Sequence, residues 1–131
     1  MATIKSFTDL EQSRNLAEIL PFESADMRIG NYVGKYACID GTNVHYYHKS
    51  ESFEAPEIIP CWSLAALLNI LHSNAKDIPS LSGGGYKDGK YISDWCLDYE
   101  FENGYYQKTF ADNPVDACVE MIEKLHEQKL L

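Results

Sequence analysis

The residue of this sequence best suited to nucleophilic chemistry is a cysteine at the start of an apolar run. Cys61 follows Pro60 and precedes Trp62 in the segment IPCWSLAALLNIL, residues 59–71. A helix that begins here would stabilise a thiolate through its dipole, and papain-like proteases place a Cys-Trp pair at such a helix start. The Gly-Ser pair that precedes the cysteine in those enzymes is replaced here by Ile59 and Pro60.

A nucleophilic cysteine also needs a general base, and the sequence has four histidines. His72 lies about ten residues further along the same expected helix, which is too far along the axis to reach back. His45, His48 and His126 are conceivable partners without a recognisable motif around them. We therefore expect Cys61 to be a packed core side chain, and a cysteine hydrolase is the alternative.

A second candidate is a row of carboxylates on one face of an alternating segment. Strand periodicity over residues 91–101 separates two faces. The apolar face carries Tyr91, Trp95, Leu97, Tyr99 and Phe101, and the other carries Asp94, Cys96, Asp98, Glu100 and Glu102. Side chains two positions apart are about 7 Å apart, so Asp98 and Glu100 are compatible with calcium binding or an acid/base pair. We expect instead a solvated face that discourages edge-to-edge aggregation, with contact to a basic protein as a third option.

Two further motifs fail on closer inspection. GGYKDGKY, residues 84–91, has the G-x-x-x-x-G-K spacing of a phosphate-binding loop. Tyr91 stands where a magnesium-binding hydroxyl is needed, and a strand pattern follows instead of a helix. The odd spacing of His45 and His48 points their rings to opposite faces of a strand, away from a shared metal. We assign no catalytic, cofactor-binding or metal-binding residue from the sequence, and we expect no cofactor.

Composition places the chain among ordinary globular proteins and excludes some partners. Its 131 residues, 45% of them apolar, predict one α+β domain over residues 1–131. Eleven basic residues against twenty acidic ones give a net charge of −9, which disfavours nucleic acid and anionic membranes as partners. The N-terminus has no signal-peptide pattern, and the four cysteines are scattered, so we expect a cytoplasmic protein with reduced thiols.

The expected elements follow from capping and turn signals. Thr8 with Glu11 predicts a capping box that opens a helix ending before Pro21. A β-hairpin is expected from Asn31 onward around Asp40-Gly41, with a two-residue or a four-residue loop. Residues 49–60 are expected to be a loop, and residues 62–72 a helix that is apolar nearly all round.

The second half is expected to contain three strands and a helix. The strand runs are residues 80–86, 91–101 and 105–110, separated by Asp88-Gly89 and Asn103-Gly104, which suit tight turns. A two-residue turn at the second site would pair Leu97 with Phe110 and Phe101 with Tyr106, with Lys108 on the apolar face.

The last helix has the clearest start signal. It is predicted to open at Asn113 with Pro114 in its first turn, and the Asp116 carboxylate favours the same end. The order is then α-β-β-α-β-β-β-α, an antiparallel sheet with helices packed on it, which is an α+β fold.

Two segments resemble a known group of small proteins. PCWSLAALLNIL and FADNPVDACVEMIEKLHE, within residues 60–130, resemble the phage ABA sandwich group of phages and integrated mobile elements. The resemblance implies a sheet with helices packed on it, a bacterial or phage cytoplasmic setting, no established activity and no functional residues to transfer. Residues 1–55 lie outside it.

The expected function is that of a non-enzymatic accessory protein that works through protein contacts and self-associates as a homodimer. The apolar second helix and the aromatic strands favour this interpretation. The acidic face further suggests mimicry of nucleic-acid charge toward a host DNA-binding protein. The alternatives are a small cysteine- or metal-dependent hydrolase, which would use Cys61 or the Asp98 and Glu100 face, and a structural part of a larger assembly.

Overall fold

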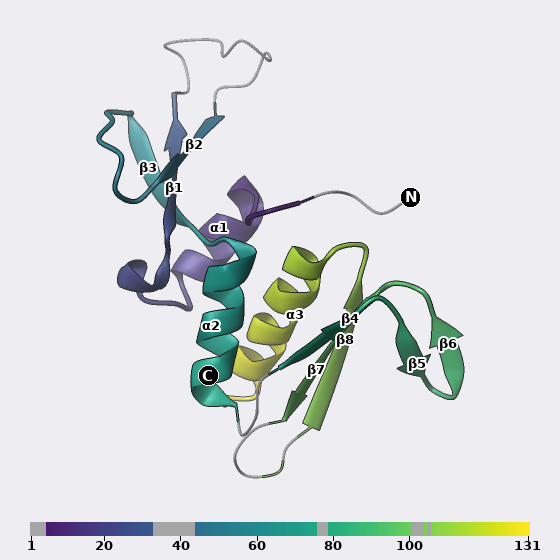
Figure 1. Ribbon diagram of the computed structural model, residues 1–131. Coiled ribbons are helices and arrows are strands. Elements are labelled where there is room, and N and C mark those ends of the chain that lie inside the picture. Colours follow the sequence, from purple (N-terminus) through teal and green to yellow (C-terminus); the bar gives the residue numbers. More distant parts are fainter. Residues whose placement is uncertain (1–4, 33–43, 76–78, 101–103, 105) are drawn as a thin grey trace.

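The protein is an α+β fold built from antiparallel strands and three α-helices over residues 5–32, 44–75, 79–100, 104 and 106–131, which the structure, a computed structural model, describes (Figure 1). In chain order the elements are α1 (Leu10–Ala17), a 3-10 helix η1 (Phe22–Ser24), β1 (Met27–Asn31), β2 (Val44–His48), β3 (Glu57–Cys61), α2 (Leu64–Asn74), β4 (Ser80–Ser82), β5 (Gly85–Lys87), β6 (Lys90–Ile92), β7 (Trp95–Glu100), β8 (Tyr106–Ala111) and α3 (Pro114–Glu127). The predicted α+β class is confirmed, and three more strands are present than the sequence indicated.

The N-terminal half forms a three-stranded antiparallel sheet in the order β2-β1-β3, with α1 against β3. The expected hairpin exists, but its first strand ends at Asn31 instead of beginning there, and the turn at residues 40–41 lies outside the described residues. The expected loop over residues 49–60 is wrong at its end, because residues 57–61 form β3. Pro60 has no N–H to donate, and it is tolerated because β3 lies at the sheet edge.

The C-terminal half forms a second sheet, in the order β4-β7-β8, with α3 packed on β7 and β8 and α2 beside α3 (Figure 1). The main core lies between this sheet and the helices. It includes Trp62, Leu67, Leu71, Leu97, Cys118, Met121, Ile122 and Leu125, all fully buried, and Leu16 of α1 joins it. The strands expected in one sheet are divided among two three-stranded sheets and a two-stranded one.

A two-stranded hairpin, β5 with β6, projects from the second sheet (Figure 1). The predicted turn at Asp88-Gly89 is confirmed, since both residues have positive φ and Lys87 pairs with Lys90 across it. The runs expected over residues 80–86 and 91–101 are each broken, so Tyr91 belongs to the hairpin instead of sharing a face with Trp95. The break lets the hairpin fold over the sheet at Cys96 and Phe110, which lie close to Gly85.

The register between β7 and β8 differs by one residue from the prediction. Leu97 lies opposite Thr109 instead of Phe110, and Tyr106 lies opposite Glu100. The slip turns Thr109 toward α3, where its buried hydroxyl donates to the Ala117 carbonyl at 2.8 Å. The prediction for Lys108 is wrong for the same reason, because it lies opposite Asp98 and forms an ion pair with it.

The helix starts show where local signals decide and where they do not. Asn113 caps α3 and Pro114 begins it, as predicted. At α1 the capping box uses Asp9 and Gln12 instead of Thr8 and Glu11, because the Thr8 side chain is buried against Cys61 and its hydroxyl accepts from the backbone of Trp62. None of the helices in the described part of the chain is long and apolar enough to cross a membrane.

Candidate functional site

Cys61, which was weighed as a nucleophile and expected to be a packed core side chain, lies in the interior and not at a helix start. Cys61 is the last residue of β3 and fully buried, while Ser63 caps α2. The Cys61 sulfur donates to the Thr8 carbonyl at 3.2 Å and accepts from the Thr8 hydroxyl at 3.4 Å. The same hydroxyl is hydrogen-bonded to the Ser13 hydroxyl. Burial raises the pKa of the Cys61 thiol and outweighs the hydrogen bonds from Thr8, so the reactive thiolate is disfavoured.

The other described cysteines are buried free thiols as well. Burial, with the nearby Asp98, raises the pKa of Cys96, and burial alone raises the pKa of Cys118 to about 12. Cys38 lies outside the described residues. These environments are typical of thiols that fill space rather than react.

The histidines named as conceivable bases are bound or stacked elsewhere. His45 lies against the rings of Tyr32 and Tyr47, and His48 Nδ1 is 2.7 Å from the Ser50 hydroxyl. His126 Nδ1 is 3.4 Å from the carbonyl oxygen of Leu131 at the end of the chain. His72 lies on the exposed side of α2. The structure gives none of them as a partner of the Cys61 sulfur.

The carboxylate row is only partly a solvated face. Asp94 is exposed, Glu100 is half-buried opposite Tyr106, and Glu102 lies outside the described residues. Asp98 accepts a hydrogen bond of 2.5 Å from the Tyr106 hydroxyl and lies 3.4 Å from Lys108 Nζ. No group of three or more histidine, cysteine or carboxylate side chains able to hold a metal occurs among the residues that the structure describes.

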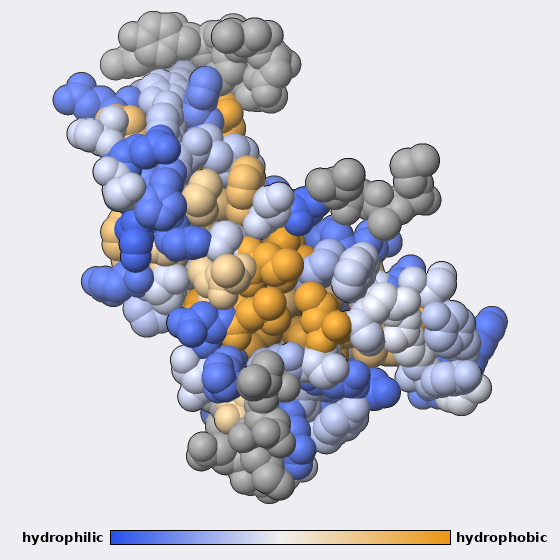
Figure 2. Space-filling model, in the orientation of Figure 1, coloured by the Kyte–Doolittle hydropathy of each residue, from blue (hydrophilic) through white to orange (hydrophobic). Residues whose placement is uncertain are grey.

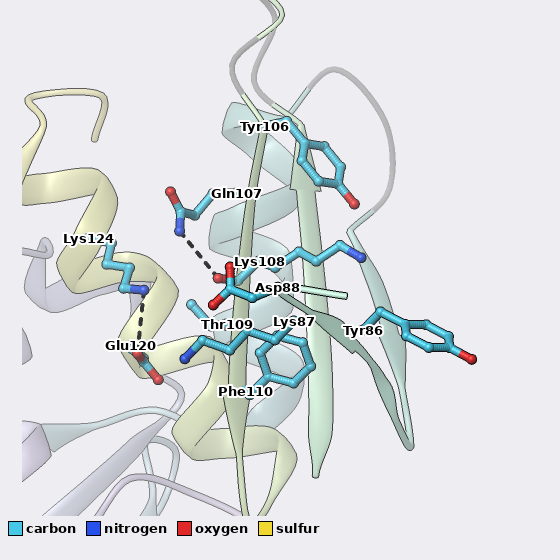
Figure 3. Close-up of a pocket in the computed structure, with 10 residues that line it drawn as sticks. All are labelled: Tyr86, Lys87, Asp88, Tyr106, Gln107, Lys108, Thr109, Phe110, Glu120 and Lys124. Carbon is cyan, nitrogen blue, oxygen red and sulfur yellow. Dashed lines mark hydrogen bonds and ion pairs between the residues drawn. The ribbon is translucent and has the colours of Figure 1, made fainter. Parts of the chain in front are cut away.

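A cleft of about 320 Å³ lies along β8, between the β5–β6 hairpin and α3 (Figure 3). Figure 3 shows the β8 residues between α3 and the β5–β6 hairpin. The lining residues are Tyr86, Lys87, Asp88, Tyr106, Gln107, Lys108, Thr109, Phe110, Glu120 and Lys124. The β5–β6 hairpin therefore meets the consecutive elements β8 and α3 at one edge of the sheet.

The position of the cleft follows from the sheet order and from one glycine. β8 is the last strand in the order β4-β7-β8, so one of its edges has no neighbouring strand in the described structure. The hairpin approaches because Gly85 has no side chain: a Cβ there would lie 3.1 Å from the Cys96 sulfur and 3.4 Å from the Phe110 ring. The hairpin therefore rests on the sheet and forms one wall of the cleft.

Exposed tyrosines lie at the cleft: Tyr86 and Tyr106 line it, and Tyr91 packs against Tyr86. Tyr86, Tyr91 and Tyr106 are 65%, 57% and 55% exposed. The Tyr86 and Tyr91 rings pack edge to face, with centroids 5.5 Å apart. The hydrogen bond to Asp98, together with burial and nearby negative charge, raises the pKa of Tyr106 to about 12. Tyr106 is therefore a fixed hydrogen-bond donor at neutral pH and leaves its ring face open to solvent.

The cleft is locally basic in an acidic protein. Lys87, Lys108 and Lys124 line it, against the carboxylates of Asp88 and Glu120. Lys124 lies 3.5 Å from Glu120 in an exposed pair, and Lys108 pairs with Asp98. Pairs of this exposure contribute little free energy, so the ammonium groups remain accessible to another carboxylate.

Two other hollows differ in character. One, of about 350 Å³, lies beside α2 and is lined by Ala65, Leu68, Asn69, His72 and Pro79. Figure 2 shows apolar side chains gathered near the middle of the face where Figure 1 places α2 and α3. The other, of about 400 Å³, lies between the ends of α1 and α3 and includes Glu18, Glu123, Glu127 and His126.

Comparisons of the chain with protein-family models, curated proteins and solved structures find no match. The functional argument therefore rests on the geometry of the described residues. Sequence reasoning took the aromatic strands as support for protein contacts, but it did not predict the cleft. The signal available in the sequence was the alternation of tyrosine and lysine in YKDGKY and YYQK.

Proposed function

We propose that this protein is a non-enzymatic interaction module that binds a partner protein at the β8 cleft. The observation that carries the proposal is the cluster of exposed tyrosines around a hollow at a free strand edge. Tyrosine gives a large contact area at a small cost in side-chain entropy, and it is enriched where protein interfaces concentrate their binding energy. A free strand edge supplies backbone groups that a partner can pair with.

The competing hydrolase proposal has less support. A cysteine mechanism needs a thiolate with a base in reach, and Cys61 is a buried thiol with a raised pKa that is bonded to Thr8. A carboxylate mechanism needs a second free carboxylate beside Asp98, which already accepts from Tyr106 and pairs with Lys108. A protein-binding role requires neither a reactive thiolate at Cys61 nor a free carboxylate pair at Asp98.

Replacing the cleft tyrosines tests the proposal. In affinity purification followed by quantitative mass spectrometry, the Tyr86→Ser/Tyr106→Ser variant is expected to lose proteins that the wild type retains. Phe22→Ser is the matched control, since Phe22 is 50% exposed and lies on η1, outside the cleft. Partners kept by the tyrosine variant and lost by the control would place the binding surface elsewhere.

Self-association is a second candidate, and the apolar hollow beside α2 favours it. A second copy covering this hollow would bury the apolar side of a helix whose Leu67 and Leu71 are already buried inside. Sedimentation velocity of Ala65→Glu, which places a charge in the hollow, should show a monomer if the wild type is a dimer. Ser52→Glu, at an exposed position outside α2 and its hollow, serves as the control. A wild-type monomer at all concentrations refutes this candidate.

The biological setting belongs to the same proposal: a cytoplasmic accessory protein of a phage or mobile element, free or within a larger assembly. What supports it is the resemblance of residues 60–130 to the phage ABA sandwich group. The genes that flank the coding sequence test it, since accessory proteins of mobile elements lie among other genes of the element.

A further inference from the structure

The free edge of β8 offers a partner a defined length of backbone. β8 runs for six residues, Tyr106–Ala111, and only β7 pairs with it in the described structure. In an antiparallel strand, alternate residues direct their N–H and C=O groups to opposite sides, so half of those in β8 point away from β7. The Lys108 carbonyl oxygen accepts from Gln107 Nε2 at 3.2 Å, a side-chain donor that the amide of an added strand can replace. Such an edge binds extended segments by strand addition.

The charge of the cleft selects among extended segments. The chain carries eleven basic and twenty acidic residues, yet in the lining of this hollow three lysines outnumber two carboxylates, Asp88 and Glu120. They stand on both sides of the edge: Lys87 on the hairpin and Lys124 on α3, with Lys108 on β8 itself. In a strand added to β8, side chains point alternately toward the hairpin side and toward the α3 side. Carboxylates at successive positions would therefore reach Lys87 and Lys124 in turn.

A second copy of this chain fits the same edge poorly. Pairing of β8 with β8 about a two-fold axis brings the same surface of both copies together. The shared surface would then gather the three lysines of each copy against only two lining carboxylates of each, Asp88 and Glu120, and this excess of like charge opposes pairing. An acidic strand from another protein meets no such opposition.

We propose that the cleft binds an extended acidic segment of a partner protein, which adds to β8 as a further strand and sets its carboxylates against Lys87 and Lys124. This inference rests on the protein-binding function proposed above and names the chemistry of the partner. The exposed rings of Tyr86 and Tyr106 cover the side chains of the added strand.

Selection from a random peptide library on the folded wild-type protein provides the probe. The expected outcome is enrichment of peptides with Asp or Glu at successive positions, one of which faces Lys87 on the hairpin side and the next Lys124 on the α3 side. The affinity of the most enriched peptide for Lys87→Glu/Lys124→Glu should fall by about tenfold or more, because two attractions become repulsions. The control is Lys90→Glu/Lys129→Glu, which changes the net charge equally at exposed lysines that do not line the cleft. Its affinity should stay within about twofold of the wild type.

Backbone methylation of the enriched peptide tests the pairing itself. Methyl groups on alternate amide nitrogens, those that face β8, should abolish binding, and methyl groups on the nitrogens between them should be tolerated. A loss without this alternation overturns strand addition. Because the protein is unchanged in this experiment, misfolding of a variant cannot produce the result.

The remaining outcomes separate this inference from the function on which it rests. Enriched peptides without acidic residues that still need Tyr86 and Tyr106 overturn the acidic segment and leave the protein-binding function intact. Equal losses in the cleft and control variants also overturn it. A library from which no peptide is enriched overturns both. A wild-type dimer that Lys87→Glu/Lys124→Glu alters, while Lys90→Glu/Lys129→Glu does not, assigns the edge to a second copy.

Discussion

Replacing Asp116 by asparagine should loosen the attachment of the N-terminal segment to α3. The Asp116 Oδ1 atom accepts from Lys5 Nζ and from Gln12 Nε2, each at 2.8 Å, and Oδ2 accepts from Asn113 Nδ2 at 2.8 Å. Lys5 Nζ also lies 2.9 Å from Asp9, the cap of α1. One carboxylate therefore joins the N-terminal segment, α1 and the first turn of α3.

The size of the effect follows from these contacts. A hydrogen bond to a charged group contributes about 1.5–3 kcal/mol when shielded from water. The side chains of Lys5 and Asp116 are 17% and 35% exposed, so solvent screening lowers this contribution. Asp116→Asn keeps the shape but loses the charge near Lys5 and the helix dipole, and we expect the free energy of unfolding to fall by about 1–2 kcal/mol. The coupling to Lys5→Met should be about 0.5–1 kcal/mol.

The ion pair between Asp116 and Lys5 makes stability depend on pH in opposite directions in the acidic and the basic range. Burial raises the pKa of Asp116, but the hydrogen bonds from Lys5, Gln12 and Asn113 outweigh it, and the pKa is lowered. Its contribution is therefore present above the unfolded value of about 4 and is lost as the pH falls through the folded value. Burial lowers the pKa of Lys5, but Asp116 and Asp9 raise it further. Its contribution is complete below about pH 10.5 and is lost as the pH rises through the folded value.

Urea denaturation followed by tryptophan fluorescence measures both the loss of stability in Asp116→Asn and the pH dependence of stability. Trp62 is fully buried and should report the loss of the core. The control is Glu120→Gln on the same helix, whose exposed pair with Lys124 should cost no more than about 0.5 kcal/mol. An Asp116→Asn variant as stable as this control would refute the reasoning. So would strict additivity with Lys5→Met, since the two charges would then not interact.

Three further predictions follow from single contacts. Gly85→Ala should lower the free energy of unfolding by about 1–3 kcal/mol in thermal or urea melts, because its Cβ would lie 3.1 Å from the sulfur beneath the hairpin, whereas Gly83→Ala, with nothing within 4 Å, should not. Asp98→Asn should bring the pKa of Tyr106 from about 12 back toward 10 in an ultraviolet or NMR titration, and an unchanged value would contradict the hydrogen bond. Iodoacetamide should leave Cys61 unlabelled in the native protein at neutral pH and label it in urea, and rapid native labelling would revive the hydrolase.

Local chemistry made the last helix predictable. Asn113 accepts from the Asp116 amide, and Pro114 occupies a position that needs no N–H donor. The turn at Asp88-Gly89 was predictable for a similar reason, because the two residues themselves accept positive φ. In these cases the residues that define the structure lie within a few positions of one another.

Distant partners decided the elements that sequence reasoning placed wrongly. The residue that caps α2 is Ser63 and not Cys61, because both the amide and the hydroxyl of Ser63 donate to Asp26, which lies just before β1. Pro60 led to the prediction of a loop, yet residues 57–61 form β3 because they pair with β1, which lies about thirty positions earlier in the chain. Thr8 was predicted to cap α1, but Asp9 caps it, because the Thr8 side chain is buried against Cys61. None of these partners is visible from local periodicity.

The candidate site could not be predicted because it depends on how the β5–β6 hairpin meets β8 and α3 and on the register of β8 against β7. The β7–β8 slip of one residue decides that Lys108 faces Asp98 and that Thr109 faces α3. The predicted register would have put Phe110 under α3 and removed it from the cleft. Among the described residues of the predicted carboxylate row, only Asp98 and Glu100 belong to β7, and the Tyr106 partner of Asp98 is set by that register.

The net charge and the charge of the cleft act at different distances, which reconciles an acidic partner with an acidic protein. The charge of −9 repels an acidic segment at long range, but salt at physiological concentration screens this repulsion beyond about 8 Å. At contact, the segment meets Lys87 and Lys124 and pairs with the edge of β8. Screening therefore speeds association by weakening the long-range repulsion, and it speeds dissociation by weakening the local attraction. Backbone pairing is insensitive to salt, so an acidic strand suits this cleft better than a partner held by charge alone.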